Sequence, residues 1–202
     1  MTIPMPTDTT RRALLAGAAA WGLFARPASA LSAEESTAFI RQLVADIDAV
    51  IAAGGSEATM IGKFEQLFLR YADVGIMAQY ALGVDGRRAT AAQKQAFANA
   101  FAGYISRKYG KRFKQFIGGR IEIEGARRIK PGYEIKTTAY LRGESPIEVI
   151  FLVSDKSGRG QFFNMFIEGV NLLLTERAEI GAMLDRRGGD IDQMTADLSR
   201  AG

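Results

Sequence analysis

Apolar residues recur at helical spacing in the part of the chain that follows residue 30. Phe39, Leu43 and Ile47 are four residues apart, behind an acidic Ser-Ala-Glu-Glu start that suits a helix N-terminus. A later stripe of aromatic residues begins after Thr90, which is a favourable N-cap residue. The pattern predicts amphipathic helices over residues 32–53, 56–71, 73–82 and 90–116.

Beyond the glycine pair at 118–119 the spacing changes from helical to alternating. Tyr133, Ile135 and Thr137 fall on one face of an expected strand, and charged residues fall on the other. Short turns rich in glycine and proline separate the segments, and such links favour antiparallel neighbours. The expected fold class is therefore α+β, with helices packed on a mostly antiparallel four-stranded sheet. The expected strands cover residues 120–129, 133–142, 147–154 and 160–168.

The last two expected strands are apolar on both faces in their middle. In the third strand, Val149 and Phe151 point away from Ile150. Such strands are either covered on both faces, or covered on one face while the other lines a cavity, and the pattern leaves both arrangements open. In the fourth strand, strict alternation puts Phe163, Met165 and Ile167 on one side and Phe162 and Phe166 on the other.

The first thirty residues have the parts of an export signal. Two arginines, Arg11 and Arg12, precede an apolar run, and small residues ending at Ala30 form a cleavage site. The paired arginines are compatible with twin-arginine export and with an ordinary secretory signal. The apolar run is well short of the roughly 20 residues that span a bilayer. We predict a signal peptide over 1–30 and a single domain over 31–202.

Composition and charge exclude several kinds of chemistry. The chain has no histidine and no cysteine, which excludes Ser-His triads, thiol nucleophiles and imidazole or thiolate metal sites. The formal charge is +4; three arginines against Asp8 in the first thirty residues account for +2, which leaves +2 for the remainder. This near balance does not favour a nucleic-acid binder, and no glycine-rich nucleotide motif is present. We expect no metal, no cofactor and no nucleic-acid partner.

Two segments resemble the MlaC or toluene-tolerance family. In residues 162–184, an apolar strand passes through Glu168-Gly169-Val170 into an amphipathic helix that carries Arg177, as in the C-terminal signature of that family. Residues 97–116 resemble its long aromatic helix, and with weaker matches at 81–83 and 87–90 the resemblance covers about residues 33–200. The departures are Phe162 or Phe163 for a Trp, Asn164 for an Asp, Asn171 for a Ser and Glu176 for a Tyr.

The resemblance implies a periplasmic lipid carrier of an ABC transport system, and not an enzyme. Its fold would be a cystatin-like or nuclear-transport-factor-like cone that encloses an apolar cavity between helices and sheet. The cargo would be a phospholipid, or a hopanoid as in one branch of the family. The implied partners are an inner-membrane ABC permease complex with its substrate-binding ring, and an outer-membrane lipoprotein–porin complex.

The face assignments and the resemblance together give candidate site residues. Glu168 and Arg177 are expected at the mouth of the pocket, because each lies beside apolar sequence in the family segment; a structural ion pair or a helix-face charge is the alternative. The expected lipid-binding residues are Tyr104, Ile105, Val149, Phe151, Phe163, Met165, Ile167, Leu172 and Leu173.

Basic residues cluster towards the end of the long helix, where they alternate with aromatic residues. They form either a solvated helix face or a surface that docks on a partner or on anionic headgroups. The residues are Arg107, Lys108, Lys111, Arg112 and Lys114.

Two rival functions remain open. One is a small α+β-cone enzyme, in which a carboxylate base in an apolar pocket acts on a hydrophobic substrate. The missing histidine and the lack of a plausible buried Asp argue against it, and Glu122 and Glu124 share a strand face that is expected to be wet. The other rival is an interaction module that carries no ligand.

Overall fold

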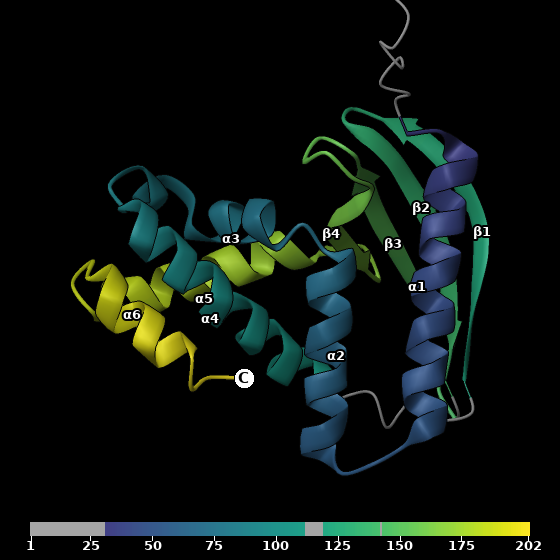
Figure 1. Cartoon of the computed structure of the whole chain (residues 1–202), viewed down its shortest axis with the longest axis horizontal. Coiled ribbons are helices and arrows are strands. Elements are labelled where there is room, and N and C mark those ends of the chain that lie inside the picture. Colours follow the sequence, from purple (N-terminus) through teal and green to yellow (C-terminus); the bar gives the residue numbers. More distant parts are fainter. Residues whose placement is uncertain (1–30, 112–118, 142) are drawn as a thin grey trace, which may run out of the picture. The chain divides into compact units, whose positions relative to one another are not determined.

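The computed structural model describes residues 31–111, 119–141 and 143–202, and residues 31–202 form a compact unit of their own. The elements, most of them labelled in Figure 1, are α1 (Ala33–Ala53), α2 (Glu57–Tyr71), α3 (Val74–Leu82), the 3-10 helix η2 (Gly83–Arg87), α4 (Ala91–Gly110), β1 (Arg120–Ile129), β2 (Gly132–Tyr140), β3 (Ile147–Ser154), β4 (Gln161–Ile167), β5 (Val170–Asn171), α5 (Leu172–Arg186) and α6 (Ile191–Leu198).

Side-chain caps fix the starts of the two long helices. The Ser32 hydroxyl accepts from Glu35 N, and the Glu35 carboxylate accepts from Ser32 N, so α1 begins with a reciprocal capping box. Thr90 and Gln93 make the same pair of bonds at the start of α4. Because a polar N-cap contributes about 1 kcal/mol, both starts are set by the local sequence. The predicted starts of α1 to α4 differ from the observed starts by one residue.

The strands form one antiparallel sheet in the order β1-β2-β3-β4-β5. The predicted four-stranded meander is confirmed, and β5 adds a fifth strand of two residues. Ile135 of β2 lies opposite Phe151 of β3, which in turn lies opposite Met165 of β4. The residues predicted to share the covered face of the second strand are all buried: Tyr133, Ile135, Thr137, Ala139 and Leu141.

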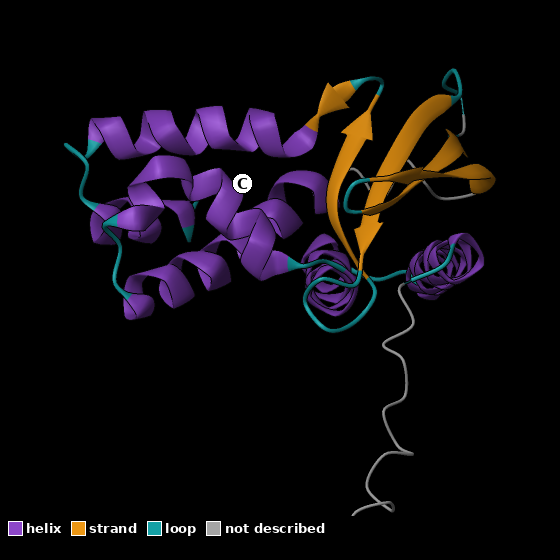
Figure 2. Ribbon diagram, turned by 90° about the horizontal axis from the view of Figure 1, so that it is seen from above, coloured by secondary structure: helices purple, strands orange, loops and turns teal. Residues whose placement is uncertain are grey.

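Helices α1 and α2 lie across one face of the sheet, and Figure 2 shows both of them end-on from above. Helix α1 packs against β1 and β2, whereas α2 packs against α1 and α4. Helices α3, α4, α5 and α6 form a second group beside the sheet (Figure 1). Helix α2 therefore lies between α1 and this group, and a single hydrophobic core runs through both parts.

Hydrogen bonds join the helix group to the sheet where α2 ends and α3 begins. Asp73 N donates to Phe162 O at 2.8 Å, and Gln161 Nε2 donates to Ala72 O at 2.7 Å. Gln161 is buried, so its amide needs this partner. The start of β4 is thereby fixed against the helices.

A β-bulge corrects the predicted face assignment of the fourth strand. The pairing of β3 with β4 shifts between Leu152 and Val153, so that Val153 lies opposite Phe162 while Leu152 lies opposite Asn164. The extra residue, Phe163, breaks the strict alternation on which the prediction relied. As a result Phe162, and not Phe163, shares the covered face with the later residues of β4.

Some elements were not predicted, and some predictions fall outside the described residues. The predicted elements did not include η2, β5 or α6, which are short. The predicted signal peptide, the predicted end of the long helix at 116, and Arg112 and Lys114 lie outside the described ranges. Within residues 31–111, 119–141 and 143–202, no helix has the length and apolar character needed to cross a bilayer. The same ranges hold no group of three or more acidic side chains arranged to bind a metal ion.

Candidate functional site

An apolar pocket of about 190 Å³ lies between α1, α2 and the sheet face that these helices cover. Helices α4 and α5 and the loop between β2 and β3 complete its wall. The lining residues are Leu43, Ile47, Phe64, Leu67, Phe68, Ile105, Tyr109, Ala139, Leu141, Glu144, Ile147, Val149, Phe151, Phe162, Met165, Ile167 and Leu172.

The lining offers mainly hydrocarbon to a ligand. Its polar side chains are Tyr109, whose hydroxyl donates to Glu176 Oε1, and Glu144, which is exposed in the β2–β3 loop and marks a place where the lining meets solvent. Such a surface favours an apolar ligand through the hydrophobic effect alone. Ligand pockets usually measure about 300–1,000 Å³, so a long chain enters only if parts of the lining move apart.

Six of the nine residues predicted to bind lipid line this pocket: Ile105, Val149, Phe151, Met165, Ile167 and Leu172. Whether they contact a ligand stays a prediction. The other three lie elsewhere. Tyr104 and Leu173 are buried outside the lining, and the β-bulge puts Phe163 out of step with the pocket face.

The sequence prediction missed the wall that α1 and α2 provide. Its residues are on the apolar faces of the two predicted helices, so their spacing did indicate that they are buried. The spacing could not indicate which helices cover the pocket side of the sheet, because that choice depends on tertiary packing. The missed residues on these helices are Leu43, Ile47, Phe64, Leu67 and Phe68.

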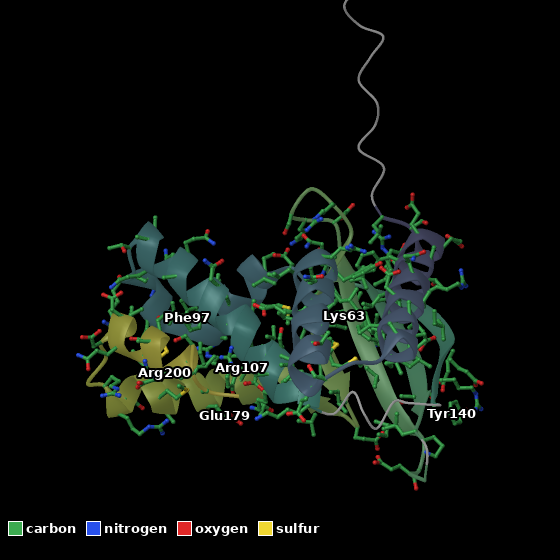
Figure 3. The ribbon with its side chains drawn as sticks, turned by 60° about the horizontal axis from the view of Figure 1, so that its bottom comes forward. Lys63, Phe97, Arg107, Tyr140, Glu179 and Arg200 are labelled. Carbon is green, nitrogen blue, oxygen red and sulfur yellow. The ribbon has the colours of Figure 1, made fainter. Side chains whose placement is uncertain are left out.

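A buried cluster of polar side chains lies between α4 and α5, next to the pocket. The Glu176 side chain is 0% exposed; its Oε1 accepts from Lys108 Nζ at 2.9 Å and from the Tyr109 hydroxyl at 2.6 Å. Lys108 Nζ also donates to Glu179 Oε2 at 2.7 Å and to the Tyr104 hydroxyl at 3.0 Å. Glu179, labelled in Figure 3, is the exposed member. We call Tyr104, Lys108, Tyr109, Glu176 and Glu179 the ion cluster.

Electrostatics within the ion cluster favour the charged forms of its outer members. A hydrogen bond from Lys108 lowers the pKa of Glu179 below its usual value, against the opposing effect of burial. Burial disfavours the charged Lys108, but hydrogen bonds to Glu179 and Glu176 outweigh it, and the pKa of Lys108 is raised. Burial and a hydrogen bond to Glu179 raise the pKa of Tyr104 well above its usual range, so this phenol stays neutral.

The sequence contained a signal for the buried carboxylate. Glu176 is four residues after Leu172 and four before Ile180, and both of these are buried, so it occupies the apolar face of α5. The prediction instead considered its neighbour Arg177 and the turn residue Glu168.

The structure places neither Glu168 nor Arg177 in the pocket lining. Arg177 crosses the end of α3, with its guanidinium 5.5 Å from the centre of the Tyr80 ring. A Cβ at Gly83, which has φ 63°, would be 3.0 Å from Arg177 Nε, so a glycine there leaves room for this contact. Glu168 has φ 51° in the tight β4–β5 turn, and its carboxylate accepts from Glu148 N. The acidic residue that lines the pocket is Glu144.

The basic residues of the long helix that lie in the described ranges make bonds within the protein, and their role in docking stays a prediction. Arg107 Nε donates to Ala201 O at 2.7 Å, and Lys111 Nζ donates to Gly202 O at 2.8 Å. Lys108 is the centre of the ion cluster. These three cations therefore hold the C-terminal segment and α5 to α4, and a role in docking would have to compete with those contacts.

The fold and the pocket define a class of protein, an α+β binding domain in which two helices and a meander sheet surround an apolar pocket. The chain belongs to the MlaC family, because the family described as MlaC protein matches residues 38–200. The predicted resemblance is thereby confirmed at the level of the family. A phospholipid-binding protein from Ralstonia solanacearum, solved in complex with a phospholipid, shares the fold with a TM-score of 0.69 at 20% identity, over 81% of this chain and 98% of that chain.

Proposed function

We propose that this protein binds a lipid by burying its apolar part in the pocket between α1, α2 and the sheet. The observation that carries this proposal is the lining, which is hydrocarbon except for Tyr109 and Glu144. The Ralstonia solanacearum protein with the same fold was solved with a phospholipid bound, which supports a phospholipid as the cargo here. A hopanoid is the alternative cargo.

The proposed role is carriage between membranes. The protein would receive or deliver its lipid in the periplasm at an inner-membrane ABC permease complex with its substrate-binding ring, and at an outer-membrane lipoprotein–porin complex. Membership of the MlaC family and the signal-like first thirty residues support this role. Because each buried methylene contributes about 0.8 kcal/mol, release would have to be coupled to contact with a partner.

The buried carboxylate does not favour the rival enzyme function. Glu176 would be the obvious general base, but both of its oxygens accept from Lys108 and one also accepts from Tyr109. The hydroxyl of Tyr109 is bonded to this carboxylate while the residue itself contributes to the pocket wall. The base would therefore have to break its ion pair before it could reach a substrate.

Two measurements test this proposal. The protein is purified and extracted with organic solvent, and the extract is examined by mass spectrometry. Carriage predicts lipid in amounts comparable with the protein, whereas an extract without lipid from freshly exported protein would favour the interaction module. Cell fractionation tests the location, because full-length chain that accumulates in the cytosol with its Met1 end intact would contradict export.

A further inference from the structure

Tyr109 belongs both to the wall of the pocket and to the ion cluster. Its side chain lines the pocket on the side of α4 and α5, together with Ile105 and Leu172. Its hydroxyl donates to Glu176 Oε1 at 2.6 Å, so the polar end of the residue is bonded outside the apolar lining. The residue therefore separates an apolar space from a buried charge.

Two members of the ion cluster, Glu176 and Lys108, restrain this side chain. Glu176 is fully buried, and Lys108 Nζ bonds to both of its oxygens, at 2.9 and 3.2 Å. If the Tyr109 ring turned away, the carboxylate would lose a charge-assisted hydrogen bond and would face the apolar pocket. Other aromatic lining residues, such as Phe68 and Phe162, have no polar group and are held by packing alone. Tyr109 is thus the wall residue that resists displacement by a ligand.

We propose that Tyr109 determines how much apolar chain the pocket accepts on its α4–α5 side, and that Glu176 and Lys108 are positioning residues that hold it in place. The inference rests on the proposed lipid-binding function and specifies the selectivity of the same pocket. A chain that extends beyond Tyr109 would have to displace an anchored ring, so affinity should rise with chain length up to a limit and then fall.

The test compares the purified, delipidated protein with three variants. Saturated phosphatidylcholines of increasing chain length compete with a fluorescent phosphatidylcholine, and the chain length of tightest binding is recorded. Tyr109→Leu replaces the ring with a smaller side chain and so enlarges the pocket. Tyr109→Phe keeps the ring but removes the hydroxyl that bonds to Glu176. Tyr104→Leu is the matched control, because Tyr104 belongs to the ion cluster but lies outside the lining. Circular dichroism establishes that each variant is folded.

Tyr109→Leu should move the optimum to longer chains, with binding tightened about four-fold for each further methylene that enters the pocket. Tyr109→Phe should keep the optimum but discriminate less against longer chains, because its ring can move. Tyr104→Leu should behave as the wild type. If Tyr109→Leu does not fold, the reduced discrimination of Tyr109→Phe carries the test.

An unchanged optimum in a folded Tyr109→Leu, or an equal shift in Tyr104→Leu, would overturn the inference while leaving lipid binding intact. Discrimination in Tyr109→Phe equal to that of the wild type would overturn the role of the anchor. Wild-type protein that binds no phosphatidylcholine, no fluorescent probe and no lipid from its own cells would instead remove the proposed function, and the inference with it.

Discussion

Glu176 is a carboxylate with no solvent exposure, and the protein itself supplies its counter-charge through Lys108. Removing two charges from water is costly, and the attraction between them offsets that cost only when the geometry is good and the remaining lone pairs are satisfied. Here the Tyr109 hydroxyl supplies the additional hydrogen bond. The pair thus contributes little net stability compared with two apolar residues. Either charge without the other would destabilise the folded protein.

Replacing Lys108 with Met should therefore destabilise the protein by about 3 kcal/mol, because it leaves the Glu176 carboxylate buried without a counter-charge. The double variant Lys108→Met with Glu176→Leu should be more stable than Lys108→Met alone. Urea unfolding measured at neutral pH compares the wild type, the single variants Lys108→Met and Glu176→Leu, and the double variant. A double variant whose losses simply add would contradict the buried pair.

A second consequence concerns pH. The Lys108 hydrogen bond lowers the pKa of Glu179 below its usual 4.5, so at acid pH the unfolded chain takes up a proton before the folded protein does. Stability from this carboxylate is therefore present above pH 4.5 and is lost as pH falls through the lower, folded pKa. Glu179→Gln should make the acid loss of stability shallower, as measured by urea midpoints over a pH series.

Asp48→Asn is the control for this prediction, because Asp48 is an exposed carboxylate on α1, away from the ion cluster. It should leave the acid loss as steep as in the wild type. The loss should not vanish in Glu179→Gln, because hydrogen bonds also lower the pKa of Asp46 and Asp197. Equal steepness in Glu179→Gln and wild type would count against the Lys108–Glu179 bond.

Among the elements, α6 depends on a side chain from another helix. It has only eight residues, too few for a helix that is stable alone. Arg107 of α4 donates to Leu198 O, the last carbonyl of α6, and to Ala201 O three residues further on, and so caps the C-terminal end of the helix. Figure 3 labels Arg107 and also Arg200, which pairs with Asp197 at the surface.

Arg107→Met should accordingly speed amide hydrogen exchange in α6 by roughly ten-fold, because bonds from a charged donor to the helix end are lost. Arg200→Met removes an arginine of the same neighbourhood whose own side chain is 70% exposed, and it should change exchange in α6 only slightly. Mass spectrometry of exchanged peptides from residues 191–198 provides the comparison. Equal effects of the two variants would show that Arg107 is not the cap.

Much of the element order could be predicted from the sequence, because capping residues and turn residues act locally. Ser32 and Thr90 begin helices, and β1 and β3 have the predicted bounds. The bulge at Phe163 could not be predicted, because it depends on pairing with β3. Helix α6 was missed although Asp190 is a favourable N-cap residue and apolar residues follow it at helical spacing; only its C-terminal cap comes from a distant part of the chain, from Arg107.

The candidate site was predictable only where a local sequence pattern defines the face of a strand. Alternation along β3 identified Val149 and Phe151 as members of one face, and both line the pocket. The contribution of α1 and α2 depends on which face of the sheet they cover, and no local pattern encodes that. The ion cluster depends on Lys108 and Glu176 meeting across two helices that are separated in sequence by the whole sheet.

At the scale of the whole molecule, two helices and a meander sheet surround an apolar space that their side chains do not fill completely. The residues around it are hydrophobic but incompletely buried, as Val149, Met165 and Ile167 are. Ordinary cores are packed to high density with few voids. A retained apolar space of about 190 Å³ therefore supports the proposal that a lipid binds in this pocket.

The most direct test of this account compares two neighbouring positions of β3. Val149 lines the pocket, and Ile150, the next residue, lies on the opposite face of the sheet and is also partly buried. Lipid is extracted from purified wild type, Val149→Glu and Ile150→Glu and quantified per protein by mass spectrometry, with folding checked by circular dichroism. The account predicts that a folded Val149→Glu loses its lipid while Ile150→Glu keeps the wild-type amount. Wild-type amounts of lipid in Val149→Glu would contradict the account, because the lipid would then be bound elsewhere.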